Sequence, residues 1–425
     1  MAMSQPILGC IADDFTGGTD LASMLVRGGM RTLQVIDVPV GPIDADVDAI
    51  VIALKTRTLP AEQAVEQSLT ALAWLKATGC RQYFFKYCST FDSTAQGNIG
   101  PVADALLDAL DTPFALACPA FPENQRTLFN GHLFVGDTLL NESGMRHHPL
   151  TPMADSNLVR VLQQQTPRKV GLVRHATVSQ GAAAVRLALA DAQAGGFGYA
   201  IVDAISNADL TVIGEAASEQ RLITGGSGVA LGLPDNYKRA GLLADTACAA
   251  DLPPVDGLAA VLSGSCSVAT NGQVAHWHDS GKPSFAIDPL RLAEGHDLVT
   301  EALDWAQPLL AQGPVLIYAS AQPDAVKAVQ ARLGVEAAGE IVERALAQIA
   351  LGLQELGVRT FVVAGGETSG AVVKALGVKA LRIGPSIAPG VPWTLGLGQV
   401  PVALALKSGN FGGPGFFTQA LELAP

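Results

Sequence analysis

The chain has 425 residues, 49% hydrophobic and 16% charged, which is long enough for two or three domains with their own cores. Its net charge of −12 and its lack of basic runs argue against a nucleic-acid partner. No apolar run of roughly 18 residues predicts a membrane span, and no secretion signal opens the chain, so we expect a cytoplasmic protein with no membrane partner.

Short apolar runs predict buried parallel strands throughout the chain. Between them lie alanine-rich stretches of helical spacing, such as residues 61–79, which end in a glycine of C-cap type. The alternation predicts an α/β fold. In chain order the predicted strands are ILGCIA, AIVIAL, QYFFKY, FALAC, VGLVRH, YAIVDA, LAAVLS, VLIYAS, TFVVAG and VALAL.

A composition change predicts one domain boundary. Residues 244–257, ADTACAADLPPVDG, place a Pro-Pro pair beside acidic residues just before a new strand. We therefore predict two domains, residues 1–245 and 246–425, each with a largely parallel sheet flanked by helices.

The cysteines and histidines show no metal-binding or redox pattern. The six cysteines lack C-x-x-C spacing and lie mostly in apolar runs, which favours reduced thiols. The histidines lack metal-ligand spacing; we expect His147 and His148 in a polar loop, and His276 and His278 at a solvated helix end.

Three predicted strand ends in the first half carry charged and hydroxyl side chains: residues 12–20, 54–58 and 86–98. Ligands of open α/β sheets bind beyond the carboxyl ends of the strands, so we expect a sugar-acid site there. Taken alone, the Asp-Asp pair fits a turn and helix N-cap equally well. The candidate residues are Asp13, Asp14, Thr16, Lys55, Arg57, Lys86, Ser89, Asp92, Ser93 and Thr94.

The strand ends of the second half are small, glycine-rich and nearly uncharged: residues 263–267, 364–370 and 407–413. Glycine lets a phosphate approach backbone N–H groups closely, so this half is the expected phosphate site. Each segment alone also fits an ordinary turn. Neither G-x-x-x-x-G-K-[ST] nor a well-placed G-x-G-x-x-G is present.

Together, these motifs resemble the four-carbon acid sugar kinases. The similarity rests on IADDFTGGTD, KYCSTFDSTAQGNIGP, VLSGSCSVATNGQ, AGGETSGAVV, APGVPW and ALKSGNFG, and it spans nearly the whole chain. KYCSTFDST favours the branch that acts on 3-oxo-tetronate over the threonate and erythronate kinases. Gly17 and Gly18 stand where a single glycine is more usual.

The resemblance implies ATP-dependent phosphorylation of the terminal C4 hydroxyl of the acid sugar. It also implies an N-terminal sugar-acid domain, a C-terminal nucleotide domain and an active site in the cleft between them. The ATP contacts carried over are Ser263, Gly365, Gly366, Glu367, Thr368 and Gly409. The acid-sugar contacts are Asp13, Asp14, Arg57, Lys86 and residues 89–94, among them Ser89, Ser93 and Thr94.

Phosphoryl transfer requires a base for the acceptor hydroxyl, commonly an aspartate, and Mg²⁺ on the phosphates. We expect Asp13 and Asp14 to point in opposite directions, as strand alternation requires. Asp14 is our candidate base and Asp92 its rival. Arg57 and Lys86 would hold the substrate carboxylate.

Two other classes of function stay open from the residues. One is a non-catalytic sugar-acid-binding protein. The missing secretion signal counts against a binding protein that serves transport. The other is an NAD-dependent dehydrogenase, against which the missing dinucleotide fingerprint counts. A homo-oligomer is also left open.

Overall fold

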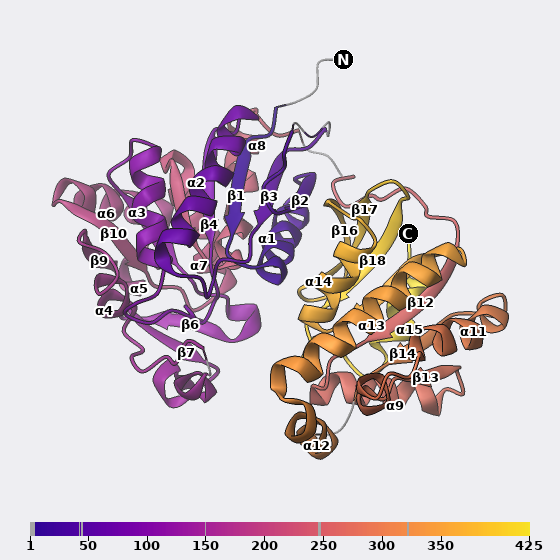
Figure 1. Cartoon of the computed structure of the whole chain (residues 1–425). Helices are drawn as coiled ribbons and strands as arrows, with labels where there is room; N and C mark the ends of the chain where they lie inside the picture. Colours follow the sequence, from indigo (N-terminus) through magenta and orange to yellow (C-terminus); the bar gives the residue numbers. More distant parts are fainter. Residues whose placement is uncertain (1–4, 42, 44–45, 149, 245–247, 321–322) are drawn as a thin grey trace. The chain divides into compact units, whose positions relative to one another are not determined.

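The computed structural model describes residues 5–41, 43, 46–148, 150–244, 248–320 and 323–425, apart from the side chains of 323–327 and 335–336 (Figure 1). The chain divides into two compact units, Met1–Ala250 and Asp251–Pro425. The domain boundary predicted between residues 245 and 246 lies outside the described residues. Within the described part, no helix has the length and apolarity to cross a membrane.

The N-terminal unit is built on a parallel sheet whose strands are almost entirely buried. In sheet order the strands are β2 (Thr32–Ile36), β3 (Ala49–Ala53), β1 (Leu8–Ala12), β4 (Gln82–Lys86), β11 (Leu222–Gly225), β5 (Ala115–Cys118), β10 (Phe197–Val202) and β9 (Lys169–Val173). A small antiparallel sheet joins β6 (Arg126–Phe129), β7 (His132–Val135) and β8 (Thr138–Leu139).

Helices lie in most of the connections between these strands, as is usual for parallel pairing. They are α1 (Phe15–Arg27), α2 (Ala61–Ala77), α3 (Ile99–Ala109), α4 (Leu158–Gln163), α5 (His175–Val178), α6 (Ala182–Ala194), α7 (Asn207–Ala216) and α8 (Pro234–Arg239). Residue 12 at the end of β1 pairs with Ala53 of β3 and Lys86 of β4. The three strands therefore end at one level, which brings their following loops together.

The C-terminal unit has a mixed sheet. Its parallel part runs β13 (Ser284–Ala286), β14 (Val315–Tyr318), β12 (Leu258–Ser263), β15 (Val358–Ala364) and β18 (Val402–Lys407). The antiparallel strands β17 (Val391–Leu397) and β16 (Ala380–Ala388) follow. The helices are α9 (Val268–Asp279), α10 (Pro289–Ala293), α11 (Leu298–Leu310), α12 (Pro323–Leu333), α13 (Val335–Glu355), α14 (Gly366–Ala375) and α15 (Phe416–Glu422).

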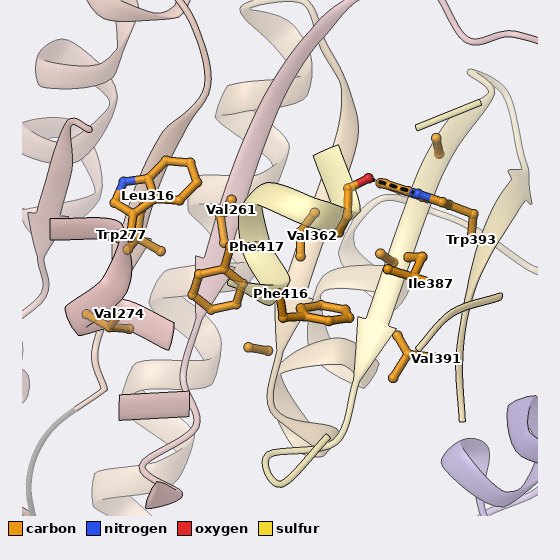
Figure 2. Packing of buried hydrophobic residues seen from close by; sticks show 14 residues of the cluster. Val261, Val274, Trp277, Leu316, Val362, Ile387, Val391, Trp393, Phe416 and Phe417 are labelled. Carbon is orange, nitrogen blue, oxygen red and sulfur yellow. Dashed lines mark hydrogen bonds between the residues drawn. The ribbon is translucent and has the colours of Figure 1, made fainter. Parts of the chain in front are cut away.

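Aromatic packing fixes α9 and α15 against this sheet (Figure 2). Trp277 of α9 meets Phe417 of α15 edge to face, with ring centroids 6.4 Å apart. Trp393 of β17 donates its indole N–H to the Ala420 carbonyl at 3.1 Å. Burying side chains of this size contributes about 1.5–3 kcal/mol each. Helix α9, which follows β12, is therefore held firmly against the sheet.

The α/β prediction is confirmed: each unit has a largely parallel sheet with flanking helices. Every predicted strand is present, and the helix predicted over 61–79 is α2, after which Gly79 adopts a positive φ of 91°. The sequence reading missed β2, β11, β13, β16, β17 and the small antiparallel sheet. All six cysteines are free thiols.

Candidate active site

The ends of β1, β3 and β4 bring the aspartate pair, the 54–57 loop and Lys86 together. The Asp13 N–H donates to the Lys86 carbonyl at 3.0 Å, and the Thr56 N–H donates to the Asp13 carbonyl at 2.9 Å. Asp14 is the N-cap of α1, and its Oδ1 accepts the Gly17 N–H at 3.0 Å. Asp14 is therefore a helix cap, and the same residue is one of the predicted site residues.

Arg57 holds both aspartates. Its Nε donates to Asp13 Oδ2 at 2.9 Å, and its Nη2 donates to Asp13 Oδ1 at 2.8 Å and to Asp14 Oδ1 at 2.6 Å. The prediction that the two carboxylates point in opposite directions is wrong. Strand alternation does not apply to them, because β1 ends at residue 12 and both aspartates belong to the turn into α1.

The two carboxylates differ in what they leave available. Both oxygens of Asp13 are bound by Arg57, and its side chain is 5% exposed, whereas that of Asp14 is 28% exposed. Asp14 Oδ2 has no hydrogen-bond partner among the described residues. Burial raises the pKa of Asp14, and the charge of Asp13 adds to it, while Arg57, Lys86 and the Gly17 N–H oppose the shift.

Gly17 and Gly18 are each required to be small, for different structural reasons. A Cβ on Gly17 would lie 2.3 Å from Asp14 Oδ1 and 2.9 Å from Lys86 Nζ, so only glycine leaves room for these two groups. A Cβ on Gly18 would lie 3.0 Å from the Cβ of Ala53, because α1 packs closely on β3. Gly17 thus leaves room for the side chains of Asp14 and Lys86, and Gly18 allows close packing of α1 on β3.

The 89–94 segment contributes unevenly. Asp92 Oδ1 accepts the Thr90 hydroxyl at 2.5 Å, and its Oδ2 lies 4.0 Å from Arg57 Nη1. Ser93 is buried, and its Oγ accepts a hydrogen bond from Gln165 at 2.8 Å. Among the other predicted residues, Ser89 and Thr94 are partly exposed and Lys55 is exposed.

Asp20 belongs to the same cluster, and the sequence reading gave it no role. Its Oδ2 accepts a hydrogen bond from the Ser227 hydroxyl, and its buried Oδ1 has no hydrogen-bond partner among the described residues. Burial raises its pKa, while the charge of Lys86 opposes the shift. The signal was its position, since residue 20 lies three residues after Gly17 in the first turns of α1.

The C-terminal unit contains a separate cavity of about 690 Å³, well within the size range of small-molecule sites. Small residues of the strand-to-helix turns form one part of its wall, and α10, α12 and α13 form another. The lining is Gly264, Ser265, Cys266, Asp288, Pro289, Leu290, Ala319, Ala328, Val329, Gln330, Ala338, Gly339, Val342, Glu343, Gly365, Gly366, Glu367, Thr368 and Gly409.

Most of the residues expected to contact ATP line this cavity: Gly365, Gly366, Glu367, Thr368 and Gly409. Ser263 does not. It is fully buried at the end of β12, and its Oγ lies 2.7 Å from Ser320 Oγ. Ser265 and Cys266, which follow it, form the wall instead.

The turn between β15 and α14 has the geometry of an anion site. Gly365 has a φ of 125°, which favours glycine, and its Cβ would lie 2.8 Å from Thr368 Oγ1. No side chain caps the start of α14. The first N–H groups of a helix lack intrahelical partners and attract anions, so a phosphate fits at this end of the cavity.

Sequence reasoning also missed Lys407, whose side chain is 1% exposed beneath the Gly409 turn. Its signal was a lysine closing an otherwise apolar strand, directly before Ser-Gly.

Comparisons with known proteins follow the same division. Residues 8–233 match the family model described as a sugar-binding N-terminal domain, and residues 260–417 match a nucleotide-binding C-terminal domain. The chain is similar to the 3-oxo-tetronate kinase of Burkholderia multivorans, at 64% identity over 99% of this chain and 97% of that protein. It is 62% identical to the Cupriavidus necator 3-oxo-tetronate kinase over 98% of this chain and 97% of that one.

A crystal structure of a Salmonella typhimurium LT2 protein has the same fold. The two chains superpose with a TM-score of 0.91 at 46% identity, covering 98% of this chain and 99% of the other.

Proposed function

Because the chain belongs to the four-carbon acid sugar kinase family, we propose that it transfers the γ-phosphoryl group of ATP to the C4 hydroxyl of 3-oxo-tetronate. The observation that carries the choice of substrate is the identity of 60–64% to 3-oxo-tetronate kinases over 98–99% of the chain. Two sites of different chemistry, a carboxylate cluster and a glycine-lined cavity, support the division of labour between the units.

Asp14 is the proposed general base. Its Oδ2 would accept the proton of the C4 hydroxyl while the hydroxyl oxygen attacks the γ-phosphorus and ADP leaves. The partial exposure of Asp14 and its available oxygen support this role over Asp13, whose oxygens are both bound by Arg57. A pKa raised by burial makes Asp14 a stronger base than an exposed aspartate. Asp92, with one oxygen bound by Thr90, is the alternative.

Arg57 and Lys86 are the proposed cations for the substrate carboxylate, with Ser89, Ser93 and Thr94 beside them. Arg57 uses Nε and Nη2 for Asp13 and Asp14, and its Nη1, which lies 4.0 Å from Asp92 Oδ2, is the nitrogen proposed to face a substrate. Arg57 would then orient the Asp14 carboxylate and bind the substrate carboxylate at the same time. Lys86 is buried, and its Nζ donates to the Tyr87 carbonyl at 2.9 Å.

ATP is the proposed cofactor of the cavity in the C-terminal unit. The start of α14 and the Gly409 turn would bind its phosphates. The apolar wall that includes Leu290, Val329 and Val342 would pack against its adenine ring. Mg²⁺ sites on nucleotides use the phosphates and one or two carboxylates. The carboxylates that the lining offers for this are those of Asp288, Glu343 and Glu367. When bound, the ion would neutralise the phosphate charge.

The test is ADP release, measured by a coupled assay with a panel of acceptors. We expect release with 3-oxo-tetronate to exceed release with D-threonate, D-erythronate or a neutral four-carbon ketose. Preference for threonate or erythronate would move the protein to another branch of the family. If every acid binds without ADP release, the protein is a sugar-acid-binding protein; if an acid is oxidised with NAD instead, it is a dehydrogenase.

The glycine turn gives a prediction about the cavity. Gly366 lines it, and no atom lies within 4 Å of the position of a Cβ there. A valine side chain would therefore enter space needed by the nucleotide without displacing protein atoms. We expect Gly366→Val to raise the KM for ATP by about tenfold or more, with the sugar-acid KM nearly unchanged.

The matched control is Gly370→Val on the same helix. Its Cβ would also meet no atom within 4 Å, and Gly370 does not line the cavity. Both substitutions replace a glycine of α14 with a residue of higher helix propensity, so only an effect specific to residue 366 reports on the cavity. A change confined to the sugar-acid KM would reverse the assignment of the two units.

Cytoplasmic location is also part of the proposal, supported by the six free cysteines. Assembly into a homo-oligomer is left to a measurement of mass in solution.

A further inference from the structure

Lys407 connects the two glycine turns of the cavity. It is the last residue of β18 and pairs with Ala364 at the end of β15. Its backbone carbonyl accepts the Gly365 N–H at 2.9 Å, and its Nζ donates to the Gly409 carbonyl at 3.0 Å. One residue therefore holds both turns, and Gly365 and Gly409 both line the cavity.

The Gly409 carbonyl is surrounded by donors. Ser267 Oγ lies 2.6 Å from its oxygen and Thr270 Oγ1 lies 2.8 Å from it, in addition to Lys407 Nζ. Lys407 Nζ also donates to Thr270 Oγ1 at 2.9 Å. The lone pairs of this carbonyl are thus engaged by protein groups, so they are not presented to a phosphate at the turn.

The buried ammonium has no counter-ion among the described residues. Both of its hydrogen-bond acceptors are neutral oxygens, and no carboxylate forms an ion pair with it there. Burial lowers the pKa of Lys407 to about 8. A buried charge is costly unless an anion compensates it, so the arrangement is complete only when an anion binds nearby.

We propose that Lys407 is a positioning residue for the nucleotide phosphates: its ammonium fixes the Gly409 turn and supplies the positive charge that balances phosphate bound there. This rests on the proposed function, because it presumes a nucleotide in the C-terminal cavity. Adenosine, which lacks phosphate, should not depend on Lys407.

No second cation lies at this end of the sheet on the described residues of β15, β17, α9, α14 or the 408–413 turn. Strand β17 and residues 408–413 carry no ionisable side chain. Arg359 lies at the start of β15, at the opposite end from Ala364. Helix α9 carries His276, His278 and Asp279 in its second half, and α14 carries Glu367 in its first turn and Lys374 in its last.

The experiment titrates full-length protein with ADP and, separately, with adenosine by calorimetry. We expect Lys407→Met to weaken ADP binding by about tenfold or more, the scale of a lost charge-assisted contact. Adenosine affinity should change by less than about twofold, because no phosphate is involved. Thr394→Val is the matched control: it removes another buried hydrogen bond to β18, at 2.8 Å from Leu404 O, away from the cavity lining.

The pH dependence of ADP binding distinguishes a role for the charge of Lys407 from a purely structural role in holding the Gly409 turn. With a pKa of about 8, Lys407 is mostly charged below that pH and mostly neutral above it. A phosphate bound nearby favours the charged form and should raise this pKa. Wild-type protein should therefore take up protons on binding ADP above pH 8, and the uptake should be absent in Lys407→Met. Equal weakening of ADP and adenosine by Lys407→Met, or unchanged ADP binding, would overturn the inference.

Two further results keep the test decisive. If wild-type protein binds neither ADP nor ATP, the proposed function fails; if it binds ADP and Lys407→Met binds equally well, only this inference fails. Should Lys407→Met not fold, Thr270→Val removes one acceptor of the ammonium while keeping the side-chain shape. It should move the proton uptake to lower pH and weaken ADP but not adenosine; no change in either would also overturn the inference.

Discussion

Asp14→Asn is expected to lower kcat for 3-oxo-tetronate by about 10²-fold or more, the usual scale for losing a general base. The amide keeps the shape of the side chain but cannot take the proton of the C4 hydroxyl. Asparagine caps helices about as well as aspartate, so α1 should keep its start at Phe15. The KM for ATP should stay near its wild-type value. Steady-state kinetics with both substrates varied measures all of these quantities.

The control is Asp297→Asn at the N-cap of α11. There the aspartate accepts the Thr300 N–H at 3.1 Å, so the substitution makes the same cap exchange away from the cluster. Asp92→Asn is the competing experiment. Near-normal turnover in Asp14→Asn together with a large loss in Asp92→Asn would transfer the role of base to Asp92.

Arg57→Lys is expected to lower kcat/KM for the sugar acid by about 10- to 10³-fold. Lysine keeps the positive charge, but it cannot make the paired contacts from Nε and Nη2 to Asp13 or reach Asp14 at the same time. Asp14 would lose the contact that orients its carboxylate, and the substrate carboxylate would lose its contact with Nη1 of Arg57.

A neutral four-carbon ketose separates these two contributions. It has no carboxylate to bind, so its kcat/KM should fall less than that of the acid when Arg57 is replaced. Equal losses on both substrates would confine Arg57 to orienting the aspartates and would place the carboxylate elsewhere. Circular dichroism and thermal melting of the variant guard against unfolding as the cause.

The sequence predicted the fold well where burial is complete. Fully apolar runs such as LGCIA and AIVIA became central parallel strands, because both faces of such strands are covered. The missed strand β2 contains Gln34, which is buried and donates to the Phe15 carbonyl at 3.0 Å. Strands β16 and β17 contain proline and glycine, which usually indicate a loop. A polar or turn-forming residue that tertiary contacts satisfy cannot be recognised from periodicity.

The sequence predicted which residues of the candidate site lie near one another, but not which hydrogen bonds they form. Strand ends located Asp13, Asp14, Arg57 and Lys86, since parallel strands end at one edge. That Arg57 would bind both aspartates depended on the turn after β1, which strand geometry does not describe. Ser263 was carried over from a motif, yet the structure buries it against Ser320. Lys407 was overlooked, because its contacts to the Gly365 and Gly409 turns exist only once the sheet has folded.

Phosphorus and proton NMR of the product formed from ATP and 3-oxo-tetronate is the most direct test of the central claim. In this substrate C4 carries two hydrogens and C2 carries one, so the splitting of the phosphorus signal identifies the oxygen that received the phosphoryl group. The account predicts one phosphate monoester per ADP, split into a triplet by the C4 protons. A doublet from the C2 proton, or ADP and inorganic phosphate without any ester, would contradict it.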